Sequence, residues 1–349
     1  VQFRDVIDGL GDRLTVYNCW GEGVLIGSSD GVILQNSVIY DNFALNVYTS
    51  HASNFIIRNN LIYGTGTAPF LRGDKPCSNL IIADEYKPGE PNGTGQTVVN
   101  NLIMGGSRNI GFWDFTWQGN ENSGLIDAVI ANNTLLDAVT YGIEINEGVH
   151  DNAKVYNNVI ANPNTDAPLA KVTNDSELMF DYNLWDEQPN GAASGSNDTI
   201  NASLGLRQSG PTGPGKLKPY YFDVTDEFAG MNAGTIDAGV DVDFNGTTRD
   251  SLPDIGAIEY TGQPMDVNKL SSKETIHIYP NPATNEVHLQ MENQHEKRWI
   301  YVFDSQGKIC SSDVGKGDVS FEIDDFLPGL YSVVIIDQLS KSNIRFIKQ

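Results

Sequence analysis

Four charged residues in the middle of the chain have side chains that could carry acid–base chemistry: Arg108, Glu144, Glu147 and Lys154. A basic group can abstract a proton beside a carboxylate that a second positive group neutralises, and this is how a uronic acid chain is broken by elimination. Charges of this kind are also common on solvated strand faces, and we favour that simpler interpretation. The four residues are therefore weak candidates for catalysis.

An aromatic cluster follows shortly after Arg108. Alternate side chains of a β-strand share a face, so Trp113, Phe115 and Trp117 would point to one side and Phe112 to the other. Three rings on one face could pack beneath a neighbouring loop. They could equally form a platform on which sugar rings stack, since an exposed apolar patch usually marks a binding surface. Both interpretations stay open, and the three residues are candidates for glycan binding.

An aspartate-rich turn further along the chain has the spacing of a calcium-binding loop. Asp241, Asp243 and Asn245 place oxygen ligands at alternate positions, and Gly246 supplies the sharp turn that such loops need. The twelfth position is Leu252, where the loop requires a bidentate glutamate. Ca²⁺ is therefore a weak expectation, and we favour a tight turn held by backbone bonds to aspartate.

The net charge of the chain at pH 7 is −23, from 45 acidic and 22 basic residues. Residues 1–274 hold 35 of the acidic and 15 of the basic side chains. The electrostatic field of this negative charge repels phosphate backbones and anionic lipid. It therefore argues against nucleic acid as a partner and favours divalent cations as ligands. Three cysteines are too few for a disulfide framework or a zinc site, although a single bridge between Cys19 and Cys77 is an alternative.

A pattern of apolar residues and asparagine repeats through the first half of the chain. Its first asparagine slot falls at positions 36, 59, 100, 132, 157 and 182. A period in the low twenties, made of short β-runs and turn residues, is typical of a parallel β-helix with about three short strands per coil. Asparagine suits the bends because it tolerates left-handed backbone, and it can stack on itself from coil to coil. A β-sandwich with asparagine-rich turns is the alternative.

Two steps of this series are long, and both point to inserted loops. In the first, SNLIIAD at 78–84 is similar to SNFIIRN at 53–59, which assigns the extra length to the loop 86–96. The second insertion is 111–124. Both insertions follow the same part of the repeat on neighbouring coils. We therefore expect both to project from one face, where repeat proteins commonly bind their partners.

The ends of the repeat region are less regular. Phe3 to Leu10 has apolar residues at helical spacing, so the chain begins with either a short capping helix or a partial first coil. No signal peptide is present, which suggests a mature end or a fragment boundary. The period is lost after residue 186, and we expect residues 187–260 to cap the solenoid. Within them, IDAG, DVDFNGTTR and PDIGAIEY resemble the terminal segment of many bacterial surface β-helix proteins.

Residues 261–274 form a polar linker, and residues 275–349 form a separate domain. Alternating apolar residues divided by turn signals predict a small Ig-like β-sandwich. The segments IHIYPNPATNEVHL, IYVFDSQGKIC, LPGLYSVVII and RFIKQ resemble, in order, the type A sorting domain of the type IX secretion system of the Bacteroidetes. The sorting-signal residues implied by this resemblance are Tyr279, Pro280, Asn281, Pro282, Asp304, Gly307, Lys308, Gly329, Tyr331, Phe346 and Lys348.

The resemblance also implies where the protein goes and what it meets. It implies export across the outer membrane of a Gram-negative bacterium, to the cell surface or the medium. The implied partners are the type IX translocon, an outer-membrane shuttle barrel that receives residues 275–349, and a sortase-like peptidase that cuts in or near 261–274. Thr199 and Ser251 resemble O-glycan acceptors of such exported proteins. We expect 345–349 to be ordered, as an edge strand or against that barrel.

The expected fold is all-β, with a right-handed parallel β-helix over 1–260 followed by the sandwich. The expected function is that of a surface protein that binds or processes polysaccharide along the face of the β-helix. If the chain is an enzyme, it is a polysaccharide lyase or a glycoside hydrolase. The alternative is a non-catalytic adhesin or surface-layer component, carried as a cargo of the secretion machinery.

Overall fold

A computed structural model describes the chain except for residues 68–70, 72, 86, 116–117, 174–176, 201–202, 263–275, 292–297, 306–308, 316 and 337–340. The chain divides into two compact units, Val1–Pro264 and Met265–Gln349. Most of the predicted linker 261–274 lies outside the described residues. Within the described part, no helix has the length and hydropathy that crossing a bilayer requires.

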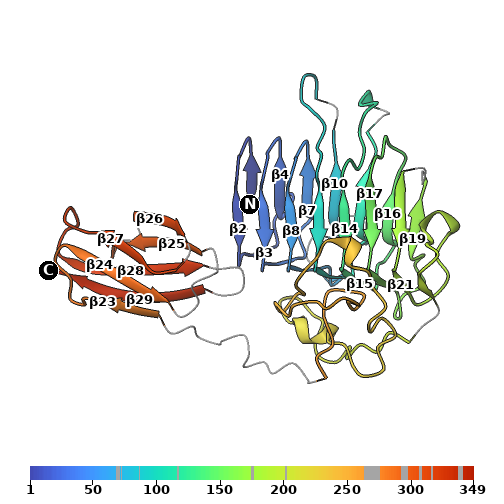
Figure 1. The fold of residues 1–349 in the computed structure, drawn as a ribbon. Helices are drawn as coiled ribbons and strands as arrows, with labels where there is room; N and C mark the ends of the chain where they lie inside the picture. The colour runs from blue at the N-terminus through green and yellow to red at the C-terminus, as the bar shows by residue number, and fades with distance from the viewer. Residues whose placement is uncertain are drawn as a thin grey trace. The chain divides into compact units, whose positions relative to one another are not determined.

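The first unit is a parallel β-helix, as predicted, in which each coil adds a strand to three parallel sheets (Figure 1). Sheet 1 contains β1 (Gln2–Arg4), β4 (Val24–Gly27), β7 (Leu45–Ser50), β10 (Ser78–Ala83), β13 (Arg108–Trp113), β16 (Tyr141–Ile145) and β19 (Ala170–Val172). Sheet 2 contains β2 (Leu10–Asp12), β5 (Ile33–Gln35), β8 (Ile56–Arg58), β11 (Thr97–Val99), β14 (Val129–Ala131), β17 (Ala153–Tyr156) and β20 (Leu178–Asp181). Sheet 3 contains β3 (Thr15–Tyr17), β6 (Val38–Tyr40), β9 (Leu61–Tyr63), β12 (Leu102–Met104), β15 (Thr134–Leu136), β18 (Val159–Ala161), β21 (Leu184–Trp185) and β22 (Thr199–Ile200).

Apolar side chains stacked from coil to coil fill the interior of the solenoid. In sheet 1, Val47 of β7 pairs with Leu80 of β10, which pairs with Ile110 of β13, and all three are fully buried. Because alternate residues of a strand point to opposite faces, one apolar residue in two is enough to build this row. Each buried side chain of this size contributes about 1.5–3 kcal/mol relative to an exposed one.

The asparagine slots fall at equivalent bends of successive coils, which confirms the predicted register. Asn36, Asn59, Asn100, Asn132, Asn157 and Tyr182 all have left-handed backbone, with φ between 52° and 56°. The hydrogen-bonded ladder is formed by the next residue of each repeat. Asn101 Nδ2 donates to Asn133 Oδ1 at 3.0 Å, and Asn133 Nδ2 donates to Asn158 Oδ1 at 3.0 Å.

One expectation about the first unit was wrong, and two alternatives that the sequence left open are decided. The chain begins with strand β1, which pairs with β4, so of the two alternatives the partial first coil is present. Ser78 pairs with Leu45 of sheet 1, so 78–84 is not equivalent to 53–59, and the extra length divides between the segments on either side of β10. The two stretches look alike because strands of different sheets share the same alternation. Cys19 and Cys77 are free.

The two insertions do project together, as predicted. The loops 84–96 and 114–128 follow β10 and β13, which are neighbours in sheet 1. The second insertion begins later than the predicted 111–124, because residues 111–113 belong to β13. Figure 1 shows both loops extending beyond the same end of the strands.

In the described part of residues 187–262, short elements follow the last solenoid strands: η2 (Gly191–Ala193), β22, η3 (Pro219–Phe222) and η4 (Ile236–Ala238). Its later part, from Thr235 to Gly256, lies along the corner between sheets 2 and 3, where the first-slot asparagines donate to its carbonyl groups. Asn100 Nδ2 donates to Val242 O at 2.6 Å, and Asn157 Nδ2 donates to Thr235 O at 2.8 Å. The left-handed bends therefore have a second role, which is to hold this segment against the coils.

The second unit is the predicted sandwich of two antiparallel sheets. One contains β23 (Ile276–Tyr279), β24 (Glu286–Met291) and β27 (Val319–Glu322). The other contains β26 (Ile309–Gly315), β25 (Arg298–Phe303), β28 (Gly329–Ile336) and β29 (Lys341–Lys348). Val287, Ile300 and Phe346 are among the fully buried residues of their common core. The last strand, β29, is an edge strand that pairs with β28, which confirms the expectation for 345–349.

Candidate functional site

The outer face of sheet 1 carries a row of side chains that changes in character along the solenoid. Leu25, Tyr48 and Ile81 occupy the row on β4, β7 and β10. Gly111 follows on β13, then Glu144 on β16 and Lys171 on β19. The first part of the row is apolar and the last part is charged.

The charged part is a cluster of three residues, Arg108, Glu144 and Lys171, which we call the Arg108 cluster. The Nε of Arg108 donates to Glu144 Oε2, and the Nζ of Lys171 donates to Glu144 Oε1 at 2.9 Å. The side chain of Glu144 is 2% exposed, whereas those of Arg108 and Lys171 are 27% and 41% exposed. Two solvent-facing cations are therefore held in place by one buried carboxylate.

A tyrosine ring completes the Arg108 cluster. Arg108 pairs in register with Tyr141 of the next coil, and its guanidinium carbon lies 6.0 Å from the centroid of that ring. The Nζ of Lys171 lies 5.5 Å from the same centroid. At these distances the ring attracts both cations, which further restricts where their charges can move.

The apolar part of the face is covered by two of the three predicted aromatic residues. Trp113 and Phe115 are half-buried and pack against a buried group that includes Leu25, Tyr48 and Ile81. Trp117 lies outside the described residues. Trp113 and Phe115 therefore serve at least as packing residues, with part of each ring in contact with solvent.

Hydrogen bonds join the two loops beside this face. The amides of Asn92 and Asn120 donate to each other's Oδ1 atoms at 3.1 and 2.8 Å. Asn120 Nδ2 also donates to Asp84 O at 2.9 Å, at the start of the first loop. The loops 84–96 and 114–128 therefore form one connected wall along the edge of sheet 1.

The base of the first loop is held by His51 and Asp84. The buried carboxylate of Asp84 accepts from the backbone N–H groups of His51 at 2.8 Å and of Gly93 at 3.1 Å. Burial raises the pKa of Asp84 to about 6, and these hydrogen bonds act in the opposite direction. The ring nitrogens of His51 face the carbonyl oxygens of Pro91 and Glu85.

The other two catalytic candidates lie outside the Arg108 cluster. Lys154 is on β17 of sheet 2, where its Nζ donates to Asp237 O at 3.3 Å. Glu147 is exposed in the segment after β16. Of the four candidates, the structure brings only Arg108 and Glu144 together.

The aspartate-rich turn is held by backbone hydrogen bonds. Asp243 is buried, and its Oδ1 accepts from the N–H groups of Asn245 at 2.8 Å and Thr247 at 2.7 Å. Its Oδ2 accepts from Glu259 N at 2.9 Å. Among the described residues, Asp241 and Asp243 belong to no group of three histidine, cysteine or acidic residues that could hold a metal ion. Ca²⁺ binding at this turn stays a prediction.

The two glycan-acceptor candidates lie in different surroundings. Ser251 is exposed in a bend. Thr199 is half-buried in strand β22 and pairs with Leu184, so it is not in the loop that its sequence suggested. A hydroxyl in a paired strand is harder for an enzyme to reach than one in a bend.

Five of the eleven predicted sorting-signal residues take part in packing, strand pairing or hydrogen bonds within the sandwich. Tyr331 and Phe346 are buried with their ring centroids 5.4 Å apart, and Gly329 pairs with Lys348 at the start of β28. Asn281 connects its turn to β29, since its Oδ1 accepts from Ile347 N at 3.0 Å. Four further candidates are exposed or half-buried: Tyr279, Pro280, Pro282 and Asp304. The last two, Gly307 and Lys308, lie outside the described residues.

Lys171 and Tyr141 are the members of the Arg108 cluster that sequence reasoning missed. Both follow from the coil register, because Lys171 pairs with Glu144 and Tyr141 pairs with Arg108. A signal existed in the sequence for Lys171 only. The alternation in AKV places Lys171 outward between the buried Ala170 and Val172, whereas Tyr141 stands at the start of its strand, where strict alternation with the buried Ile143 and Ile145 would have placed it inward.

Comparison with known families agrees with this architecture. A model of the right-handed β-helix region matches residues 10–185, and a model of the secretion system C-terminal sorting domain matches residues 277–349. No curated protein matches the chain. The sorting domain makes the protein a cargo of the type IX secretion system, exported across the outer membrane to the cell surface or the medium. The β-helix match covers half of the sequence, and the chain therefore belongs to the right-handed β-helix family.

Proposed function

We propose that the β-helix of this exported protein binds an anionic polysaccharide along the outer face of sheet 1. The observation that carries the proposal is the Arg108 cluster, which presents two fixed cations to solvent. Guanidinium and ammonium groups bind carboxylate and sulfate through charge-assisted hydrogen bonds, which are the stronger kind.

The charge of the cluster supports this choice of ligand. Arg108 and Lys171 share one carboxylate, so one positive charge is left over in a region where acidic residues outnumber basic ones. Because Glu144 is buried and holds both cations, they are positioned before a ligand arrives, and less conformational entropy is lost on binding. The half-buried Tyr141 and Trp113 add flat apolar surface beside the charges.

The geometry supports binding more than bond cleavage. Elimination requires a base that can accept a proton from the sugar. The Nζ of Lys171 already donates to Glu144, and both oxygens of Glu144 already accept hydrogen bonds, so neither group is free to take a proton from the sugar. The chain is thus better suited to act as a surface receptor or adhesin for a charged glycan than as a lyase.

The route to the surface is part of the same proposal. The sorting domain supports recognition by an outer-membrane shuttle barrel and cutting near 261–274 by a sortase-like peptidase. The last strand β29 and the turn that Asn281 fixes beside it are the surfaces that such a barrel would meet.

Calorimetry of the full chain with polygalacturonate, alginate and chondroitin sulfate tests the binding proposal, with neutral dextran as the comparison. Lys171→Met should weaken binding of the preferred polyanion about tenfold, the equivalent of about 1.4 kcal/mol. Lys87→Met is the matched control, because Lys87 is also an exposed lysine paired with one acid, Glu90, at 2.6 Å. Equal affinity for dextran, or unchanged affinity in Lys171→Met, would overturn the proposal.

A further inference from the structure

Three asparagines of this chain are followed directly by glycine: Asn92, Asn190 and Asn245. Such a pair can modify itself without an enzyme, because the two reacting groups belong to adjacent residues. The backbone nitrogen of the glycine attacks the side-chain Cγ of the asparagine, ammonia leaves, and a succinimide ring forms. Water then opens the ring at one of its two carbonyl groups, which gives aspartate or isoaspartate. Glycine favours the attack because it has no Cβ atom to block it.

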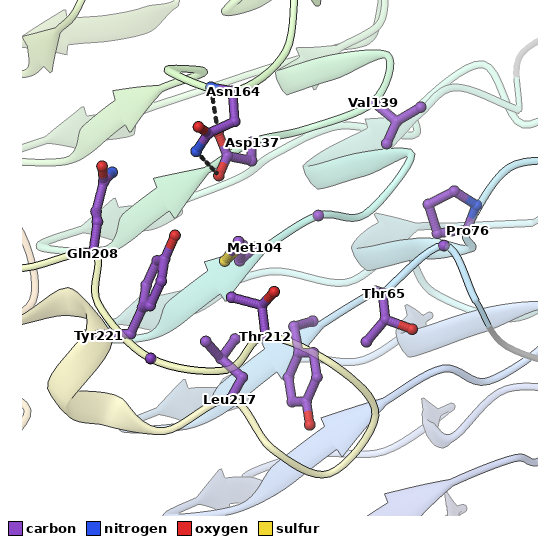
Figure 2. A pocket seen from close by; sticks show the side chains of 15 residues that line it. Thr65, Pro76, Met104, Asp137, Val139, Asn164, Gln208, Thr212, Leu217 and Tyr221 are labelled. Carbon is purple, nitrogen blue, oxygen red and sulfur yellow. Dashed lines mark hydrogen bonds between the residues drawn. The ribbon is translucent and has the colours of Figure 1, made fainter.

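The attack requires a glycine N–H that is free and an asparagine side chain that can rotate. The nitrogen reacts after it has lost its proton, and a hydrogen bond that it donates to an oxygen favours the form that keeps the proton. Hydrogen bonds of the asparagine amide hold Cγ away from the nitrogen. Asn164, beside a pocket near sheet 3, shows an asparagine restrained in this way (Figure 2). Its backbone N and its Nδ2 both donate to the carboxylate of Asp137 at 2.9 Å.

The fold restrains Asn92 on both sides of its bond to glycine. Its amide exchanges two hydrogen bonds with the amide of Asn120, at 3.1 and 2.8 Å. The N–H of Gly93 donates to both oxygens of the buried Asp84, at 3.2 and 3.1 Å. A deprotonated nitrogen at this position would lie beside a carboxylate, which disfavours it. Gly93 also packs closely on the backbone, since an added Cβ would lie 2.3 Å from Ala52 O.

The aspartate-rich turn restrains Asn245. The N–H of Gly246 donates to Asp243 O at 3.1 Å. The backbone N–H groups of Asn245 and Thr247 donate to Asp243 Oδ1 at 2.8 and 2.7 Å. Because Asp243 is fully buried, these three hydrogen bonds fix the chain on both sides of the bond between asparagine and glycine.

In the described part of the chain, Asn190 has none of these restraints. Asn190 and Gly191 are both exposed at the start of η2, where the side chain of Asn190 makes no capping hydrogen bond. The first N–H groups of a helix lack a partner within the helix, and Gly191 N donates to no acceptor among the described residues. No atom lies within 4 Å of the place where a Cβ of Gly191 would stand. Space for the ring is therefore open.

Asn190 stands where the chain closes the end of the β-helix. The short helix η2 packs against β19, the last strand of sheet 1, and Ala193 is fully buried in the same core as Trp185. The carbonyl oxygen of Asn190 accepts from Ala193 N at 3.0 Å. In isoaspartate the main chain runs through the former side chain, and this carbonyl becomes part of a free carboxylate. The turn that places Ala193 in the core therefore loses its geometry.

We propose that Asn190 is a site of spontaneous modification, where the exported protein accumulates aspartate and isoaspartate with age, and that isoaspartate loosens the end of the β-helix. Each conversion consumes one water and releases one ammonia, and it adds one negative charge at neutral pH. The hydrogen bonds of the folded chain select this one asparagine from three with the same neighbour. The reaction needs no ligand, so it is independent of what binds the Arg108 cluster.

Peptide mass spectrometry of the full chain, stored at about pH 8 where the nitrogen loses its proton more readily, tests the selection of this site. The conversion raises the mass of a peptide by about 1 Da, and aspartate and isoaspartate peptides elute separately. Asn190 should react at least about tenfold faster than Asn92 and Asn245, which corresponds to about 1.4 kcal/mol of activation free energy. In urea the hydrogen bonds are lost, and the three rates should become similar.

Two glycine variants test the attack itself. Gly191→Ala should slow the modification of Asn190 about tenfold, because a Cβ shields the attacking nitrogen. The fold should be kept, since this Cβ meets no atom and Gly191 does not have left-handed backbone. Gly21→Ala is the matched control, because Gly21 is exposed with equally open space around it, and the rate at Asn190 should stay unchanged.

Thermal unfolding of stored protein tests the effect on the β-helix. Tm of the unchanged chain should fall in step with its isoaspartate content at position 190, whereas Asn190→Ser, which cannot form the succinimide, should keep its Tm. An equal fall in stored Asn190→Ser overturns the loosening of the end. The choice of site is overturned if Asn190 stays unmodified, if the three asparagines react at equal rates in the folded chain, or if Gly191→Ala reacts as fast as Gly21→Ala.

Discussion

Replacing Arg249 by methionine tests how the segment 187–262 is attached to the β-helix. The guanidinium of Arg249 is almost fully buried and donates four hydrogen bonds. Its Nη1 donates to Glu259 Oε2 at 2.7 Å and to Asp254 O at 3.1 Å. Its Nη2 donates to Gly256 O at 2.8 Å and to Asn100 Oδ1 at 3.1 Å. The methionine keeps the apolar stem and removes all four.

The expected loss of stability is large because Glu259 would remain buried without its cation. Removing one partner of a buried ion pair costs about 3–5 kcal/mol. For a unit of this size, each kcal/mol shifts Tm by about 2–4 °C, so Tm of the β-helix should fall by about 6–20 °C. Thermal unfolding of the full chain followed by circular dichroism measures this shift. Lys87→Met removes an exposed ion pair with Glu90 and should cost less than about 1 kcal/mol.

The pH dependence gives this experiment a second readout. Burial raises the pKa of Glu259 to about 7 while Arg249 acts in the opposite direction, so the pKa should rise further in Arg249→Met. A carboxyl whose pKa is raised by folding contributes stability that is present at low pH and lost as pH rises through the folded pKa. The deficit of Arg249→Met should therefore be smaller at about pH 5 than at about pH 8. An equal deficit at both pH values, or one no larger than in Lys87→Met, would refute this reasoning.

Three further predictions follow from other parts of the chain. Asn133→Ala should lower the free energy of unfolding of the β-helix by about 2–6 kcal/mol in urea unfolding, because Asn101 N and Val98 O would lose their side-chain partner inside the protein. Asn197→Ala, at an exposed position, is the control and should cost about 1 kcal/mol. Asp223→Asn should raise Tm at about pH 8 and have less effect at about pH 5, because burial raises the pKa of Asp223 to about 6 and neither of its carboxylate oxygens accepts a hydrogen bond among the described residues. A Tm that falls at both pH values would contradict this. Deleting 340–349 removes the edge strand β29, so the truncated protein should stay inside the cell with its β-helix folded. Cell fractionation measures its location and protease resistance measures its folding. Normal amounts of the truncated chain at the cell surface would count against a role of this strand in export.

The repeat could be predicted from the sequence because each coil is subject to the same local requirements. A left-handed bend must recur at the same place in every coil, and asparagine meets that requirement at low cost, as at Asn59 and Asn132. The ladder was placed one residue early, however. Asn132 and Asn133 are the same residue type at adjacent positions, so the sequence does not distinguish them. Only the direction of each side chain decides which one stacks in the interior.

The Arg108 cluster was harder to predict because insertions change the length of each coil. Arg108 and Glu144 are 36 residues apart, whereas Glu144 and Lys171 are 27 apart. Lys154 is much closer to Glu144 in sequence, yet it belongs to another sheet. Proximity in sequence therefore misleads when the register between coils is unknown.

The net charge of the protein sets a condition on how a polyanion can bind the Arg108 cluster. At 0.01 M salt the Debye length is about 30 Å, so the negative charge of the whole β-helix acts on an approaching polyanion and opposes binding. At 0.15 M salt the Debye length is about 8 Å, so the salt screens the charges of the distant acidic residues but not direct contacts of the polyanion with Arg108 and Lys171. Affinity for the polyanion should therefore rise between these two salt concentrations and fall again near 1 M, where the length is about 3 Å. Ordinary basic patches lose affinity steadily as salt is added, because binding releases counterions. A steady decrease across this range in calorimetry would show that the ligand contacts a larger basic surface than the two cations of this cluster.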